Sequence, residues 1–208
     1  DKLSSYGRVV IVAPLGAMSA KSVSISIGHP LLVKKMEEDV YAIDGTPADC
    51  TAFGLSSLNI KFDLVVSGCN DGFNISYDIM YSGTIGACLQ ALTYRVPAIA
   101  FSVQGNFQIV DKYFDKVFNY IIENKLISHE YLLNVNFPLG DEVSEIMLTD
   151  IYYRKETTYF IDNGDNLFTA WREIKDEECD DGHSDAFAVY HHHVSITKIN
   201  KTGLFKED

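Results

Sequence analysis

The sequence has four cysteines without any Cys-x-x-Cys spacing, and it lacks the run of roughly 18 apolar residues that a membrane-spanning helix needs. Its first seven residues have neither the positive charge nor the apolar run of a signal peptide. These absences argue against a membrane protein and against a secreted protein held together by disulfides. We therefore expect a cytoplasmic protein with reduced thiols and no membrane partner.

Positive charge is scarce, since 17 lysines and arginines stand against 29 aspartates and glutamates, for a net charge of -12. Affinity for a nucleic-acid backbone comes mainly from lysines and arginines that neutralise phosphates, so we expect no nucleic-acid polymer as a partner. A small anionic substrate remains compatible with this charge, because a metal ion or a helix N-terminus can dominate the local field.

Several short motifs of common enzymes are also absent. The sequence has no G-x-G-x-x-G, no Walker A sequence, no G-x-S-x-G and no H-E-x-x-H. This argues against dinucleotide-binding proteins, P-loop NTPases, α/β-hydrolases and zincins. His191 and His193 would share one face of a strand, but with no third ligand nearby we favour a polar strand face over a zinc site. The acidic run at 176–181 is interpreted as a solvated loop.

What the sequence does contain is an alternation of strand and helix patterns from residue 8 to residue 138. Buried strands are predicted at 8–14, 62–66, 96–103 and 132–138, shorter strands or hairpin arms at 24–33 and 41–43, and helices at 46–58, 85–92 and 110–124. The second of these helices follows the loop after residue 66, and the first begins with a capping box in which Asp49 has a structural role. This order predicts an α/β fold with a Rossmann-like core and a mostly parallel sheet.

The character of the chain changes after residue 140. Residues 151–153 and 157–161 have the aromatic and β-branched content of strands in a hairpin-like extension, and 185–197 reads as a returning strand. An exposed aromatic hairpin usually packs on a partner. We therefore predict an α/β core at 1–139 and a β-rich extension at 140–208 that mediates self-association, with its last strand returning to the core.

A candidate site lies at the carboxyl end of the strand at 62–66. Asn70 follows that strand, and Ser82, Gly83 and Thr84 open the next helix. Ligands of open α/β sheets bind at this edge, and a helix N-terminus favours an anion. The residues thus suit a phosphate or carboxylate site, while an ordinary serine N-cap remains the alternative. Ser19, in the loop after the first strand, could face the same crevice.

Four sequence blocks extend this pattern to a known family. They are Asp-Gly-Thr-Pro-Ala-Asp-Cys at 44–50, Asp-Leu-Val-Val-Ser-Gly-Cys-Asn at 63–70, Gly72 with Asn74, and Tyr-Ser-Gly-Thr at 81–84. In order and spacing they resemble the survival protein SurE family of metal-dependent nucleotidases, and the resemblance covers almost the whole chain. It implies a Rossmann-like core, a swapped C-terminal extension, and homodimers or homotetramers.

The resemblance also implies an activity. Family members hydrolyse nucleoside 5′- and 3′-monophosphates with one divalent cation, which for oxygen ligands would be Mg²⁺ or Mn²⁺. The family motif places metal ligands at Ser19 and Asn70. It places Asn74, Ser82, Gly83 and Thr84 near the phosphate, as catalytic residues. The alternative is a catalytically inactive SurE-like module that binds a nucleotide or a partner.

One part of the family pattern does not map onto this sequence. Two adjacent aspartates that hold the cation belong to a block after the family's first strand, upstream of Asp1. We do not assign Asp71 as their replacement. It directly follows Asn70, so its side chain is expected to point in another direction. Ser76 stands where the family usually has glycine. If the polypeptide begins at Asp1, we expect poor folding and no activity, and the upstream sequence would decide between the enzyme and the binding module.

Overall fold

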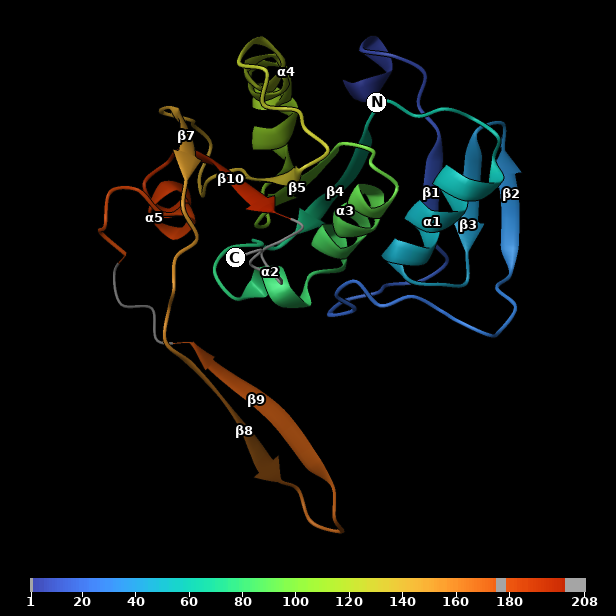
Figure 1. The fold of residues 1–208 in the computed structure, drawn as a ribbon. Coiled ribbons are helices and arrows are strands. Elements are labelled where there is room, and N and C mark those ends of the chain that lie inside the picture. The colour runs from blue at the N-terminus through green and yellow to red at the C-terminus, as the bar shows by residue number, and fades with distance from the viewer. Residues whose placement is uncertain (1, 175–178, 201–208) are drawn as a thin grey trace, which may run out of the picture.

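The computed structural model describes residues 2–174 and 179–200 (Figure 1). The helices are η1 (Lys2–Ser5), α1 (Pro47–Ser57), α2 (Asp78–Tyr81), α3 (Gly83–Thr93), α4 (Phe107–Glu123) and α5 (Asp185–Tyr190). The strands are β1 (Ile11–Pro14), β2 (Val33–Glu37), β3 (Val40–Ile43), β4 (Val65–Asp71), β5 (Ala98–Val103), β6 (Tyr131–Asn136), β7 (Ile146–Thr149), β8 (Glu156–Asp162), β9 (Phe168–Ile174) and β10 (Val194–Asn200). None of these described helices is both long and apolar enough to cross a bilayer.

The strands form two sheets and a separate hairpin. The larger sheet has the order β4-β5-β6-β10-β7, in which β4, β5 and β6 are mutually parallel and β10 runs antiparallel to β6. The smaller sheet has the order β1-β3-β2, with β1 parallel to β3. The mostly parallel arrangement confirms the predicted α/β class, and β5 and β6 confirm the strands expected at 96–103 and 132–138.

β5 lies at the centre of the core, because its two faces are covered by different helices. Ile99, Phe101 and Val103 pack against α4. Ala98 and Ala100 face the opposite way and pack in the cluster built around α3. A strand covered on both faces has no side that faces water, which explains why residues 98–101 are apolar without alternation and why Ser102 is buried as well.

The start of α1 follows the predicted capping chemistry. Thr46 is the N-cap, and its side chain accepts a hydrogen bond from the backbone of Asp49 while the Asp49 carboxylate accepts one from the backbone of Thr46. Asp49 also accepts hydrogen bonds from the backbone and hydroxyl of Ser26. These contacts confirm the structural role of Asp49 and tie the loop after β1 to the helix.

Two of the predicted strands are wrong. Residues 24–33 form a loop up to β2, because Ser26 bonds to Asp49 rather than to a neighbouring strand, and because Gly28 adopts a left-handed φ of 81°. Residues 151–153 precede the hairpin, whose arms are β8 and β9. Here the N–H of Tyr152 donates to the Asp185 carboxylate instead of pairing with a strand.

The predicted strand at 185–197 is a helix followed by a strand. Ser184 caps α5 by accepting a hydrogen bond from the backbone of Phe187, and β10 begins only at Val194. His191 and His193 therefore lie in the connection between α5 and β10, and not on one face of a strand. Of the acidic run, residues 176–178 lie outside the described residues, and Asp181 accepts hydrogen bonds from the backbone of His183 and Ser184.

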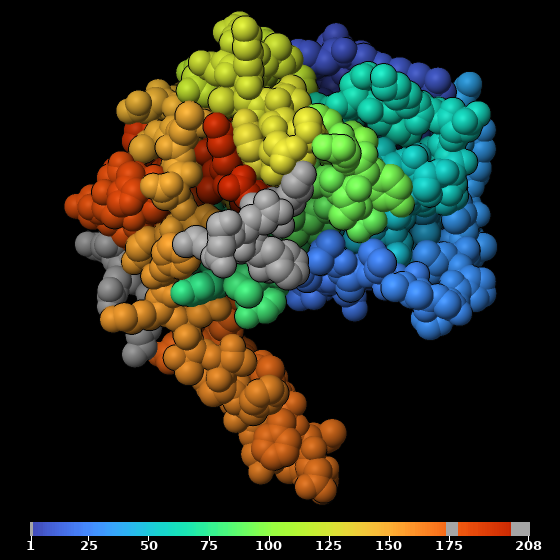
Figure 2. All heavy atoms as spheres, in the orientation of Figure 1, coloured from blue at the N-terminus to red at the C-terminus, as the bar shows by residue number. Residues whose placement is uncertain are grey.

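The β8–β9 hairpin projects away from the rest of the molecule (Figures 1 and 2). Its seven paired positions run from Glu156 opposite Ile174 to Asp162 opposite Phe168. Large apolar side chains are exposed along it, including Phe160 at 67% and Trp171 at 55%. A projecting two-stranded ribbon with these side chains in water has little core of its own.

A cavity of about 650 Å³ separates the two sheets, between β1 and β4. Both strands line it along their lengths, while α1 and α3 supply lining residues such as Cys50 and Ala87, and α4 supplies Phe114. The cavity is thus walled by two strand edges and by helices from more than one layer. It leaves Ile11, a β-branched strand residue, 48% exposed.

Candidate functional site

β4 changes direction where its polar residues begin. Gly68 has a left-handed φ of 116°, and a Cβ there would collide with the backbone oxygen of Phe101, so glycine is required. The pairing of β4 with β5 is interrupted between Ser67 and Asn70, and it resumes with Asn70 opposite Ser102. Such a bulge re-aims the side chains that follow it. It places Asn70 at the carboxyl end of the sheet, where ligands of this architecture bind.

Asn70 and Ser19 both present oxygen atoms that have no hydrogen-bond partner in the part of the chain that the structure describes. The Asn70 amide nitrogen donates to the carbonyl of Gly72 at 2.8 Å, and among the described residues no hydrogen bond uses its Oδ1. Ser19 is exposed in the turn after β1, and its hydroxyl makes no hydrogen bond within the described part of the chain. Asp71 behaves differently, since its Oδ1 accepts from the backbone of Gly105 at 2.9 Å. Asp71 is therefore engaged away from Asn70.

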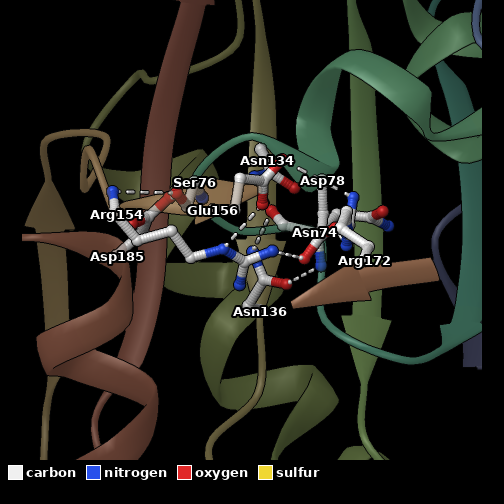
Figure 3. A network of polar contacts seen from close by, with 9 residues as sticks. All are labelled: Asn74, Ser76, Asp78, Asn134, Asn136, Arg154, Glu156, Arg172 and Asp185. Carbon is white, nitrogen blue, oxygen red and sulfur yellow. Dashed lines mark hydrogen bonds and ion pairs between the residues drawn. The ribbon is translucent and has the colours of Figure 1, made fainter. Parts of the chain in front are cut away.

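Asn74 is held in a buried cluster of amides (Figure 3). Its backbone N–H donates to Asn136 Oδ1 at 2.9 Å, and its side-chain Nδ2 donates to Ser102 Oγ at 2.7 Å. Its carbonyl oxygen accepts from Asn134 at 2.6 Å and from Asn136 at 3.2 Å. These contacts fix Asn74, which is 4% exposed. Asn134 and Asn136 were not predicted for the site, although two asparagines two positions apart in an apolar strand are a readable signal.

The N-terminus of α3 lies against the loop that carries Ser19. The backbone N–H of Ser22 donates to the carbonyl of Tyr81 at 2.9 Å, and the Ser22 hydroxyl donates to the carbonyl of Met80 at 2.8 Å. Ser82 caps the helix, because its Oγ accepts from the backbone of Ile85 at 3.2 Å. Ser82 thus has the ordinary N-cap role that the sequence left open as the alternative to a phosphate site. The amides of Gly83 and Thr84 make no hydrogen bond among the described residues.

Two carboxylates hold the loop between Asn74 and α3. Asp185, fully buried, accepts from the backbone N–H groups of Ser76, Tyr152 and Ala186 at 2.8–3.0 Å. Burial raises the pKa of Asp185 to about 6, against the lowering effect of these bonds. Asp78 forms ion pairs with two arginines from the hairpin region. Sequence reasoning missed both carboxylates, since no local spacing links them to their partners.

The oxygen donors of this edge suit a hard divalent cation only in part. Asn70 Oδ1 and the Ser19 hydroxyl are the kind of ligand that Mg²⁺ or Mn²⁺ accepts, but both are neutral. Within residues 2–174 and 179–200, no group of three or more histidines, cysteines, aspartates or glutamates could hold a metal ion. His191 and His193 lie 3.9 Å from Asp180 and Glu145 respectively. The negative charge that a cation needs is therefore not gathered in these residues.

Polar oxygen and amide groups beyond the carboxyl ends of parallel strands define the class: an α/β protein of the doubly wound kind, a class whose ligands bind at that edge of the sheet. Comparison with known proteins agrees with this class and narrows it. A family model described as "Survival protein SurE" matches residues 1–158. The chain belongs to the survival protein SurE family.

Individual relatives cover different shares of the chain. A protein named 5′-nucleotidase SurE from Clostridium botulinum (strain Alaska E43 / Type E3) is 40% identical over 149 residues, which span 66% of this chain and 59% of that protein. A protein of the same name from Clostridium botulinum (strain 657 / Type Ba4) is 33% identical over 96% of this chain and 85% of its own length. The crystal structure of SurE from Aquifex aeolicus has a TM-score of 0.79 at 33% identity, and covers 96% of this chain and 85% of that one.

Proposed function

We propose that this protein is a metal-dependent phosphatase that hydrolyses nucleoside 5′- and 3′-monophosphates to nucleoside and phosphate. Relatives named 5′-nucleotidase over most of the chain support a nucleotidase activity. The observation that carries the proposal to this chain is the arrangement at the sheet edge. At the N-terminus of α3, two amides that have no partner in residues 2–174 and 179–200 lie against the loop of Ser19. This is the edge where β4 presents Asn70 Oδ1, which is likewise unbonded in those residues.

The chain's own residues would position the phosphate. The amides of Gly83 and Thr84 and the dipole of α3 would hold phosphoryl oxygens as negative charge develops on them. Asn74, fixed by Ser102 and Asn136, would keep the loop at a constant distance from that helix. Positioning and electrostatic stabilisation account for most of the catalysis in phosphoryl transfer.

One divalent cation, Mg²⁺ or Mn²⁺, belongs to this proposal. Ser19 and Asn70 would hold it, and when bound it supplies a Lewis acid that polarises a phosphoryl oxygen. The two aspartates that the family resemblance adds would follow a strand placed in the cavity between β1 and β4. The cavity supports that placement because it runs along two strand edges and its lining is mainly apolar, as a buried parallel strand requires.

Assembly and location are the remaining parts of the proposal. The exposed aromatic side chains of the β8–β9 hairpin support a homodimer or homotetramer in which the region from residue 140 onward mediates association. The four cysteines are free thiols, and burial raises the pKa of Cys50 and of Cys69 to about 12. Reduced, unpaired cysteines are usual in the cytosol, which supports the cytoplasmic location expected from the sequence.

Phosphate release from nucleoside monophosphates, with Mn²⁺ or Mg²⁺ and then with EDTA, tests the proposal. We expect release with either metal and none in EDTA. Full activity in EDTA would contradict the metal requirement. Binding of a nucleoside monophosphate in calorimetry, without any phosphate release in Mn²⁺, would instead favour the inactive binding module.

A further inference from the structure

The base of the β8–β9 hairpin is joined to α2 by a ring of four charged side chains (Figure 3). Asp78, the first residue of α2, pairs with Arg154 at 2.7 Å and with Arg172 of β9. Glu156, the first residue of β8, pairs with Arg154 at 3.2 Å and lies 3.9 Å from Arg172. Two positive and two negative charges therefore alternate around the ring, and their sum is zero.

This ring is better shielded from water than an ordinary surface ion pair. The Arg154 side chain is 7% exposed and the Glu156 side chain 13%. Partly buried pairs are screened less by salt than exposed ones, and a planar guanidinium fixes direction as well as charge. Arg172 also lies over the ring of Tyr81, with 5.6 Å between the guanidinium carbon and the ring centroid. One arginine of the hairpin thus contacts both ends of α2.

We call this ring of charges the clamp, and residues 75–81, which include α2, the clamped segment. The clamped segment lies between the two groups proposed to bind the phosphate. Asn74 precedes it, and Ser82, the N-cap of α3, follows Tyr81 directly. Ser76, within it, adopts a left-handed φ of 53°, which is uncommon for a residue other than glycine. The position of the hairpin base and the spacing from Asn74 to α3 are therefore set by the same contacts.

We infer that Asp78 is a positioning residue for phosphate hydrolysis, which holds the segment 74–84 in register through its ion pairs with Arg154 and Arg172. The inference rests on the proposed function. A clamp that only stabilised the fold would lower the melting temperature and leave kcat of the folded enzyme unchanged. A positioning clamp changes kcat, because a displacement of about 1 Å in a reacting group can cost about a hundredfold in rate.

The test compares Asp78→Asn and Arg172→Gln with Lys112→Gln. The control removes one positive charge and one 2.6 Å ion pair with Glu142, on α4 and far along the chain from the clamp. We expect kcat to fall about tenfold or more in both clamp variants, with KM changed less than about twofold. Amide hydrogen exchange in 74–84 should become faster in the same variants. Lys112→Gln should alter neither quantity.

Arg172→Gln decides the test if Asp78→Asn does not fold, because Arg154 still pairs with Asp78 in that variant. A wild-type kcat in folded Arg172→Gln, or unchanged exchange in 74–84, would overturn the inference. So would a loss of kcat that occurs only when light scattering shows that the variant no longer assembles like the wild type. If the wild type itself releases no phosphate, the proposed function fails, while the exchange measurement still supports or overturns the clamp.

Discussion

The carboxylate of Asp185 accepts a hydrogen bond from the backbone N–H of Ser76, at 3.0 Å and across 109 positions of sequence. The contact joins the first turn of α5 to the loop that follows β4. Asp185 makes this bond while fully buried, and burial of a carboxylate disfavours its charged form. A group with this environment makes the stability of the loop depend on pH.

The first prediction concerns that pH dependence. The pKa of Asp185 is raised from 3.8 to about 6, so between these values the folded protein binds more protons than the unfolded chain. The contribution of Asp185 to the free energy of unfolding is therefore full below pH 3.8 and falls as the pH rises to about 6, by about 3 kcal/mol.

Asp185→Asn removes this titration. We compare the free energy of unfolding of the variant with that of the wild type at each pH. Between pH 3.8 and pH 7 this difference should shift in favour of the variant by up to about 3 kcal/mol, whatever its value at low pH. Urea unfolding of both proteins at several pH values measures the difference. A difference between them that stays constant across this range would show that the buried carboxylate does not titrate there.

A second prediction concerns the metal. Asn70→Ala should raise the concentration of Mn²⁺ for half-maximal activity, since it deletes an amide oxygen that no other described residue uses. It should leave the melting temperature without metal nearly unchanged. Asp71→Asn is the matched control, because Asp71 Oδ1 already accepts a hydrogen bond from the backbone of Gly105. If Asp71→Asn raised the Mn²⁺ concentration for half-maximal activity and Asn70→Ala did not, Asp71 and not Asn70 would be the metal ligand.

A third prediction concerns the contact between α3 and the loop of Ser19. A Cβ at Gly86 would collide with the backbone oxygen of Ser22, so Gly86→Ala must displace that loop. We expect a loss of about 1–3 kcal/mol in the free energy of unfolding. We also expect weaker metal binding, measured as a higher Mn²⁺ concentration for half-maximal activity. Gly16→Ala serves as the control, because a Cβ at Gly16 meets no atom within 4 Å. Equal stability of the two variants in thermal unfolding would refute this packing.

A fourth prediction concerns self-association. Phe160→Ser, on the exposed hairpin, should lower the apparent mass in light scattering while the melting temperature of the dilute protein changes little. Ile122→Ser is the control, since Ile122 is also exposed, at 44%, but lies on α4. Truncating the chain near Gly140 would be a poorer test of association, because it would also remove β7 and β10 from the five-stranded sheet and so disrupt the core. An unchanged mass for Phe160→Ser at micromolar concentration would argue against association through the hairpin.

The sequence predicted those parts of the fold whose cause is local. Thr46, Pro47 and Asp49 specify the start of α1 within four residues, and the apolar run at 98–101 in β5 specifies a strand covered on both faces. Asn70 and Ser82 could be placed at the sheet edge for the same reason, since each directly follows or opens a readable element.

The parts that could not be predicted depend on contacts between distant residues. α5 has only six residues, among them Val189 and Tyr190, so its own sequence favours a strand until Ser184 caps it and Asp185 bonds to Ser76. The clamp at Asp78 joins residues 76 and 94 positions apart. Ion pairs of this range leave no period or spacing in a single sequence, so they became visible only in the folded chain.

The strand order also has a consequence for synthesis. β10 lies between β6 and β7, and it pairs with β6 from Ser195 opposite Asn136 to Asn200 opposite Tyr131. During translation β6 leaves the ribosome about sixty residues before β10, so the edge of β6 that pairs with β10 is unpaired in the meantime. Leu132, Leu133 and Val135, which are buried in the folded protein, are not yet fully buried at that stage. An open edge of this kind is a template for wrong pairing. A nascent chain paused between residues 140 and 190 should therefore be the form most dependent on chaperones.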